Sequence, residues 1–380
     1  MKGKRTIIVL GAGASFCSGI PMQENLIEKL FMGLDTTSGE GFPSFSMTHG
    51  LIHSFPLGQY LRKYFNLPED KNKEMSKLDY WPHIQKMGYN LEGLYGELEA
   101  KLDKELSFLL EDFEAIIRTA VSTPTGDRSI NGVCNYHRRL IENLEPGDCI
   151  INFNWDSVAA DALLYCSYLW FPTTGFGLPN LYSASKFQQK QFMIQSYIHL
   201  YHLHGAVFLY KLIDKPEGSR VPEYLYIGPK SFNVMGSMHQ MMKSRDKSDD
   251  MTDEETRRFH LGYLYFNNCW YKPVFVPPSK HKTEYNSSYV LSIREHIHHQ
   301  LISAEQIIAI GYSAPESDFE HLNNFFIPNI INPKVNIKII NLENRQQEYR
   351  DKLHAIFPNT KDIDFSDADF KEWSMSLGSN

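Results

Sequence analysis

The sequence lacks long hydrophobic runs and is poor in cysteine. No window of its 380 residues approaches the roughly 18 consecutive apolar residues of a membrane span. The first apolar run, Thr6 to Leu10, leads into glycines rather than a cleavage site, so we expect no exported protein. The five cysteines are scattered and odd in number, without a Cys-x-x-Cys pair. This pattern argues against disulfides and zinc knuckles, and favours a cytoplasmic protein without metal.

An excess of positive charge is also absent. The formal net charge of -7 argues against bulk nucleic-acid binding. The hydrophobic fraction of 42% is that of an ordinary globular protein, which excludes disorder over the whole chain. At this length we expect one large domain with insertions, or two domains.

Short apolar strands alternate with helices along the chain. Strands are predicted at residues 4–10, 149–153, 197–203, 306–310 and 335–342. Helices are predicted at 24–34, 91–121 and 136–144, and an exposed polar loop at 236–258. The alternation predicts an α/β fold, with a Rossmann-like parallel sheet flanked by helices.

A glycine-rich turn follows the first predicted strand. In Gly11-Ala12-Gly13-Ala14-Ser15, glycines would let the backbone approach a pyrophosphate, whose charge suits a helix N-terminus. Phe16 replaces the third glycine of the dehydrogenase fingerprint, so the turn is not that motif. A tight turn without a ligand stays an alternative. Gly19-Ile20-Pro21 follows at once and would shape a loop over the turn.

Polar side chains also end the second predicted strand. Asn154 and Asp156 alternate along it, so both could point at one ligand. The alternative is that Asp156 caps a helix starting near Ser157. Cys17 could be a nucleophile near a helix N-terminus, but no partner base is visible, which favours a small packed residue.

Three later strand ends carry further candidates. His204, beside a glycine, suits a general base. A metal-binding pair of His202 and His204, or a structural histidine, stay alternatives. The next strands end at Gly311-Tyr312-Ser313, with Asp318 just beyond, and at Asn341.

This ordered set resembles the sirtuin-like superfamily, the silent information regulator fold. The resemblance rests on Gly11 to Ser15, Gly19-Ile20-Pro21, Asn154-Trp155-Asp156, Leu203-His204-Gly205, Gly311-Tyr312-Ser313 and Asn341. Two features depart from the sirtuin deacylases. Met22, Gln23 and Glu24 replace their Asp-Phe-Arg, and their four-cysteine zinc module has no counterpart. The remaining motifs look like the NAD hydrolases of bacterial antiphage defence, some of which work beside a HerA-type hexameric ATPase or a short Argonaute.

The resemblance implies a domain organisation and an activity. Residues 1–22, 130–212 and 268–350 would form the Rossmann-like NAD-binding core, with a mostly helical insertion at 23–129, a polar insertion at 213–267 and a C-terminal tail at 351–380. NAD would be the substrate, cleaved to nicotinamide and ADP-ribose to deplete NAD in abortive infection. We expect a homo-oligomer, without nucleic acid, membrane or metal.

The resemblance also implies residue roles. Asn154 would orient water or the ribose hydroxyls, Asp156 would stabilise developing positive charge or hold the nicotinamide ribose, and His204 would accept a proton. NAD would contact Gly11, Ala12, Gly13, Ser15, Gly19, Ile20, Pro21, Gly311, Tyr312, Ser313 and Asn341. The alternatives are an NAD or ADP-ribose sensor without turnover, a scaffold subunit and a protein deacylase. The choice between NAD and NADP stays open.

Overall fold

The computed structural model describes most of the chain. The main described ranges are 3–20, 56–66, 81–102, 106–121, 133–183, 195–213, 220–228, 252–279, 287–315, 335–342 and 363–378, with the single residues 26, 27, 30, 31, 318, 322, 328 and 351. Pro21, most of the helix expected at 24–34 and most of the loop expected at 236–258 lie outside them. Within these ranges no helix has the length and apolar character needed to cross a bilayer.

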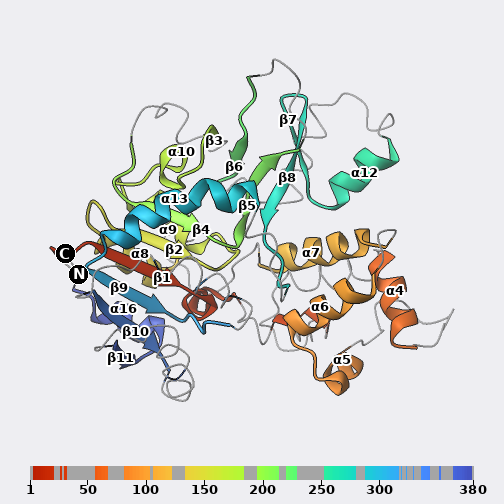
Figure 1. The fold of residues 1–380 in the computed structure, drawn as a ribbon, viewed down its shortest axis with the longest axis horizontal. Helices are drawn as coiled ribbons and strands as arrows, with labels where there is room; N and C mark the ends of the chain where they lie inside the picture. Colours follow the sequence, from red (N-terminus) through yellow and green to blue (C-terminus); the bar gives the residue numbers. More distant parts are fainter. Residues whose placement is uncertain are drawn as a thin grey trace.

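Of the two sheets in the described part of the chain, the larger has six strands and lies on the left of the view in Figure 1. Its order is β11-β10-β9-β1-β2-β4, and every neighbouring pair is parallel. The strands are β1 Thr6–Leu10, β2 Cys149–Asn152, β4 His199–His202, β9 Gln306–Ile310, β10 Asn336–Asn341 and β11 Ile363–Asp367. All five residues of β1 are buried, as the β-branched run predicted. The predicted parallel α/β sheet is therefore confirmed.

Helices flank this sheet. They are α8 Asn135–Glu142, α9 Val158–Cys166, α13 Ser288–Ile302 and α16 Phe370–Ser376, with short turns at α1 Ala12–Ser15, η1 Phe16–Ser18 and α10 Pro172–Gly175. In α8 the buried residues are Tyr136, His137, Leu140 and Ile141, which recur at helical spacing along one side. This apolar side packs α8 against α9 and α16, and so ties the C-terminus to the sheet.

A second, five-stranded sheet was not predicted. Its order is β3-β6-β5-β8-β7, and all its pairs except β3 with β6 are antiparallel. The strands are β3 Leu181–Ser183, β5 Gly205–Leu212, β6 Tyr224–Tyr226, β7 Leu264–Phe266 and β8 Cys269–Phe275. The segment 213–267, expected as a polar insertion, supplies β6, β7 and α12 Asp253–His260. Tyrosine-rich strands of three residues are too short for a periodic signal in sequence.

The described part of the insertion 23–129 is helical. It contains α4 Pro56–Tyr64, α5 Trp81–Met87, α6 Leu91–Lys101 and α7 Phe108–Val121. The prediction of one continuous helix over 91–121 is wrong, because the segment forms two helices, α6 and α7. Leu102 adopts an extended backbone, with φ of -82° and ψ of 122°, and ends α6. The apolar positions that suggested one helix are buried along both pieces.

The C-terminal segment is part of the sheet rather than a trailing tail. β11 pairs with β10 in parallel, with Ile337 opposite Ile363. α16 follows, and the side chain of its N-cap residue, Asp369, accepts a hydrogen bond from the backbone N–H of Glu372. Residues 363–376 of the segment expected as a C-terminal tail thus form β11 and α16. The other domain boundaries stay a prediction.

Candidate functional site

A cavity of about 530 Å³ opens where the parallel strands end. Carboxyl ends of parallel strands meet at one edge of a sheet, which is where ligands bind in open α/β folds. The predicted residues that line it are Gly11, Ala12, Gly13, Ile20, Asn154, Asp156, His204, Gly311, Tyr312, Ser313 and Asn341. Ser15 and Gly19 are described, but they do not line the cavity. The structure thus brings most of the predicted set to one place.

Glycines hold together the loops that follow β1 and β9. A Cβ atom on Gly11 would lie 2.4 Å from the Cα of Tyr312, and one on Gly13 would lie 2.8 Å from the Cα of Gly311. Gly311 has a φ of +57°, and a Cβ there would lie 2.5 Å from the backbone nitrogen of Ala14. The backbones therefore touch, and this contact forms one wall of the cavity. The tight-turn alternative explains these glycines at least as well as a pyrophosphate does.

Asn154 is fixed by hydrogen bonds to the glycine-rich turn. Its Nδ2 donates to the carbonyl oxygen of Gly11 over 2.8 Å and to Oγ of Ser15 over 3.0 Å. A carbonyl oxygen only accepts, so the orientation of the amide is set and Oδ1 is left as its acceptor. Ser15 therefore acts on the cavity through Asn154. The backbone N–H of Asn154 donates to Oδ1 of Asn152 over 3.0 Å, which shapes the turn.

Asp156 lines the cavity and also orders the start of α9. Its Oδ1 accepts a hydrogen bond of 2.9 Å from the backbone N–H of Val158. Burial raises the pKa of the carboxyl, while the hydrogen bonds from Val158 and Ser15 act in the opposite direction. The N-cap of α9 is Ser157, so Asp156 forms an Asx turn just before the cap. Asp156 therefore both lines the cavity and orders the start of the helix, although it is not the N-cap residue itself.

His204 lies where the chain passes from the parallel sheet to β5 of the second sheet. Its Nε2 is 3.2 Å from Oδ1 of Asp318, a fully buried carboxylate. The hydroxyl of Tyr312 donates to Oδ2 of Asp318 over 2.8 Å. The ring of Phe153 stacks on Tyr312, with centroids 4.3 Å apart, and meets His204 edge-on at 5.2 Å. Asp318 thus orients His204, and Tyr312 orients Asp318.

Asp318 was not assigned to the site from sequence. Its place just after a strand end and its part in the resemblance to the defence proteins were the signals, and neither linked it to a histidine 114 residues earlier. Several other unpredicted lining residues come from the helical insertion and from the C-terminal segment. They include Asn90, Glu92, Val121, Ala368, Asp369 and Phe370. The cavity is therefore walled partly by segments that sequence reasoning placed outside the core.

His202 has a different environment from His204. Its Nδ1 lies 3.0 Å from the backbone oxygen of Asn154, and because that oxygen only accepts, Nδ1 carries the proton. Burial lowers the pKa of His202 to about 4, so the ring is neutral near pH 7. The hydroxyl of Tyr289 donates to the backbone oxygen of His202 over 2.6 Å. The two rings serve separate partners, which does not favour the metal-binding pair.

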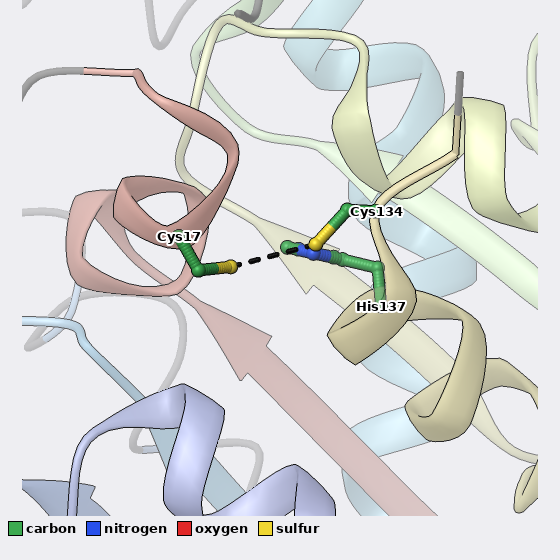
Figure 2. Close-up of side chains that lie close together, drawn as sticks. All are labelled: Cys17, Cys134 and His137. Carbon is green, nitrogen blue, oxygen red and sulfur yellow. Dashed lines mark hydrogen bonds between the residues drawn. The ribbon is translucent and has the colours of Figure 1, made fainter. Parts of the chain in front are cut away.

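Two cysteines and a histidine, all residue types that bind metal ions, lie together near the glycine-rich turn that forms one wall of the cavity. Sγ of Cys17 is 3.5 Å from Sγ of Cys134, and His137 is the third member of the group (Figure 2). The expectation that Cys17 is merely a small packed residue overlooked these partners. They follow it by more than 100 residues, so no spacing rule in the sequence connects them.

Comparisons with known proteins show a distant likeness to Sir2 structures. No protein-family model matches the chain, and no curated protein matches it. A Sir2 variant with a deacetylated p53 peptide and 3'-O-acetyl ADP-ribose is 14% identical, covering 98% of this chain and 92% of that one, with a TM-score of 0.35. Sir2 with the inhibitor EX-527, 2'-O-acetyl-ADP-ribose and the same kind of peptide is 12% identical, covering 98% and 91%, with a TM-score of 0.36. A mutant Sir2 homologue with ADP-ribose is 12% identical, covering 100% and 96%, with a TM-score of 0.36.

Proposed function

We propose that the protein binds NAD in the cavity at the sheet edge and hydrolyses its nicotinamide–ribose bond. The observation that carries the proposal is the pairing of His204 with buried Asp318 beside the fixed amide of Asn154, all at the carboxyl ends of parallel strands. The volume of about 530 Å³ lies within the usual range for small-molecule sites.

His204 supplies the base. Nε2 lies 3.2 Å from Oδ1 of Asp318, which favours the tautomer with the proton on Nε2 and leaves Nδ1 as the acceptor nitrogen. Water attacks C1' of the ribose while the bond to nicotinamide breaks, and Nδ1 takes the proton that the water loses. The bonding electrons leave with nicotinamide, which departs as a neutral base. The products are nicotinamide, ADP-ribose and one proton, and Asp318 stabilises the imidazolium formed on the way.

Asn154 and Asp156 act on the ribose. Oδ1 of Asn154 accepts a hydrogen bond from a ribose hydroxyl or from the attacking water. In its ionised form Asp156 places negative charge beside the oxocarbenium-like transition state. Burial raises the pKa of this carboxyl, and the hydrogen bonds from Val158 and Ser15 offset that rise only in part.

We assign the remaining contacts to NAD by the strand that each residue follows. Gly11, Ala12, Gly13 and Ser313 line the wall proposed for the pyrophosphate, and Asn341 lies at the end of β10, where we place the adenosine ribose. Ile20 covers the same wall. We assign Gly311 and Tyr312 to packing and to orienting Asp318, and Ser15 to holding Asn154.

The test is nicotinamide release from NAD, followed by chromatography on purified protein. His204→Ala should slow release by about 10²- to 10⁴-fold, the usual contribution of a positioned base. Asn154→Ala should slow it as well. His299→Ala, at an exposed position near the end of α13 that does not line the cavity, is the matched control and should match the wild type. An unchanged rate in His204→Ala would refute the mechanism, and tight NAD binding by calorimetry without release would favour a sensor.

We further propose that this activity depletes NAD during phage infection, through a homo-oligomer that works with a HerA-type ATPase. The support is the resemblance of the sequence motifs Asn154 to Asp156 and Gly311 to Ser313 to those of the NAD hydrolases of antiphage defence. Cellular NAD should fall after phage challenge in cells carrying the wild-type protein and its genomic neighbour, and not with His204→Ala. Stable NAD in infected cells that show protection would contradict this role. An acetyl-peptide assay separates it from a deacylase.

A further inference from the structure

Two cysteines and one histidine from distant segments meet beside the cavity wall. Cys17 belongs to η1, Cys134 is the N-cap residue of α8, and His137 lies in the first turn of that helix (Figure 2). Residues three apart on a helix lie on the same side, so Cys134 and His137 face Cys17 together. All five cysteines are free thiols.

The spacing of the donor atoms suits a tetrahedral metal ion. The two sulfurs are 3.5 Å apart, and one ligand atom from each of the three residues lies within 4.8 Å of the others. With Zn–S bonds of about 2.3 Å, two sulfurs on one tetrahedral zinc ion lie about 3.8 Å apart. Side-chain adjustments of a few tenths of an ångström would therefore accommodate the ion.

The histidine provides an independent observation. His137 has no exposed surface, and among the described residues neither of its ring nitrogens makes a hydrogen bond of acceptable geometry; the ring lies close enough to the Cys134 thiol to interact with it. A buried ring nitrogen without a partner is unusual, because losing water without compensation is unfavourable. A metal ion between the thiols and the ring would satisfy one of these nitrogens.

The geometry points to a zinc site formed by Cys17, Cys134 and His137, which departs from the expectation that the protein holds no metal. Zn²⁺ binds the two sulfurs as thiolates and the ring as neutral imidazole, releasing two protons and leaving a site of zero net charge. Three protein ligands leave the fourth position to water. The site does not depend on NAD.

The position of the site gives it a structural role. Cys17 follows Phe16, which lines the cavity, and α8 packs against α9 and α16. Zinc would clamp η1 to α8 and so hold one wall of the cavity in place.

Metal content tests the proposal directly. Protein from zinc-supplemented cells, purified without chelator, should carry one zinc ion per chain by elemental mass spectrometry. Cys134→Ser and His137→Gln should lose it. Cys166→Ser, which changes a half-buried cysteine of α9 outside the group, should keep it.

Cobalt spectroscopy on the wild-type protein makes the test independent of variant folding. Co²⁺ added to metal-free wild-type protein should produce thiolate-to-cobalt charge-transfer absorption, which Cys17→Ser should weaken. Absence of uptake by the wild type would overturn the site, as would bands that persist in a Cys17→Ser, Cys134→Ser double variant. A Cys17–Cys134 disulfide as the only state found by non-reducing mass spectrometry would also overturn it.

Discussion

As the pH decreases, protonation of the buried His202 should lower the free energy of unfolding of the protein. The ordinary histidine pKa is 6.5, and burial lowers that of His202 to about 4. The unfolded chain therefore binds a proton at a higher pH than the folded protein does. The stabilising contribution is present above pH 6.5 and is lost as the pH falls towards 4. Between about pH 7.5 and about pH 5, the two pKa values give a loss of about 2 kcal/mol in the free energy of unfolding.

The assay compares wild type with His202→Asn by urea unfolding at both pH values. Nδ2 of asparagine takes the place of the Nδ1 donor to the oxygen of Asn154, but it does not titrate. Glu114 and Asp148 have pKa values raised by burial and act in the opposite direction, so only the difference between the two proteins isolates His202. The variant should lose about 2 kcal/mol less than the wild type over this range. Equal pH dependence in both proteins would refute the reasoning.

Three further predictions concern the site and its supports. Gly311→Ala should lower the free energy of unfolding by clearly more than the about 1–2 kcal/mol of left-handed strain. Gly88 also has a positive φ but no atoms close to an added Cβ, so Gly88→Ala is the control that measures the strain without a clash. Equal losses of unfolding free energy in the two variants would contradict the clash at Gly311. Asp318→Asn should slow nicotinamide release by about 10²- to 10⁴-fold with NAD affinity retained by calorimetry, and a normal rate would remove the orienting role. Arg118→Met should cost about 3–5 kcal/mol in chemical denaturation, because the buried Glu114 loses its ion-pair partner, and adding Glu114→Gln should recover part of that loss. No recovery would refute the pairing.

Five of the six strands of the parallel sheet, all but β11, could be predicted because their signal is local. Strand β9 was placed at its observed bounds, and β1, β2, β4 and β10 within a few residues. A strand buried on both faces is a short apolar run, and its burial follows from its own residues. The glycines and polar residues at the strand ends could be grouped for the same reason, since parallel strands end at one edge.

The rest depends on contacts between distant segments. The role assigned to Asp318 depends on its contacts with His204 and Tyr312. The role assigned to Cys17 depends on its proximity to Cys134 and His137. Nothing near either residue in sequence announces these partners. In the second sheet, β3, β6 and β7 have three residues each, which is too short for a periodic signal. The longer β5 and β8 pair with each other across segments far apart in sequence. The break between α6 and α7 was missed because the apolar spacing continues across it.

The central position of β1 has a consequence for how the chain folds during synthesis. Its neighbours are β2, where Ile7 lies opposite Cys149, and β9, where Thr6 lies opposite Gln306. At about 5–20 residues per second, the ribosome would deliver the second neighbour about 15–60 s after β1 emerges. Until then an apolar strand has an unpaired edge, and edges of this kind invite pairing with other chains. We therefore expect that nascent chains need a chaperone until β9 is made, and that chains cut before Gln306 aggregate.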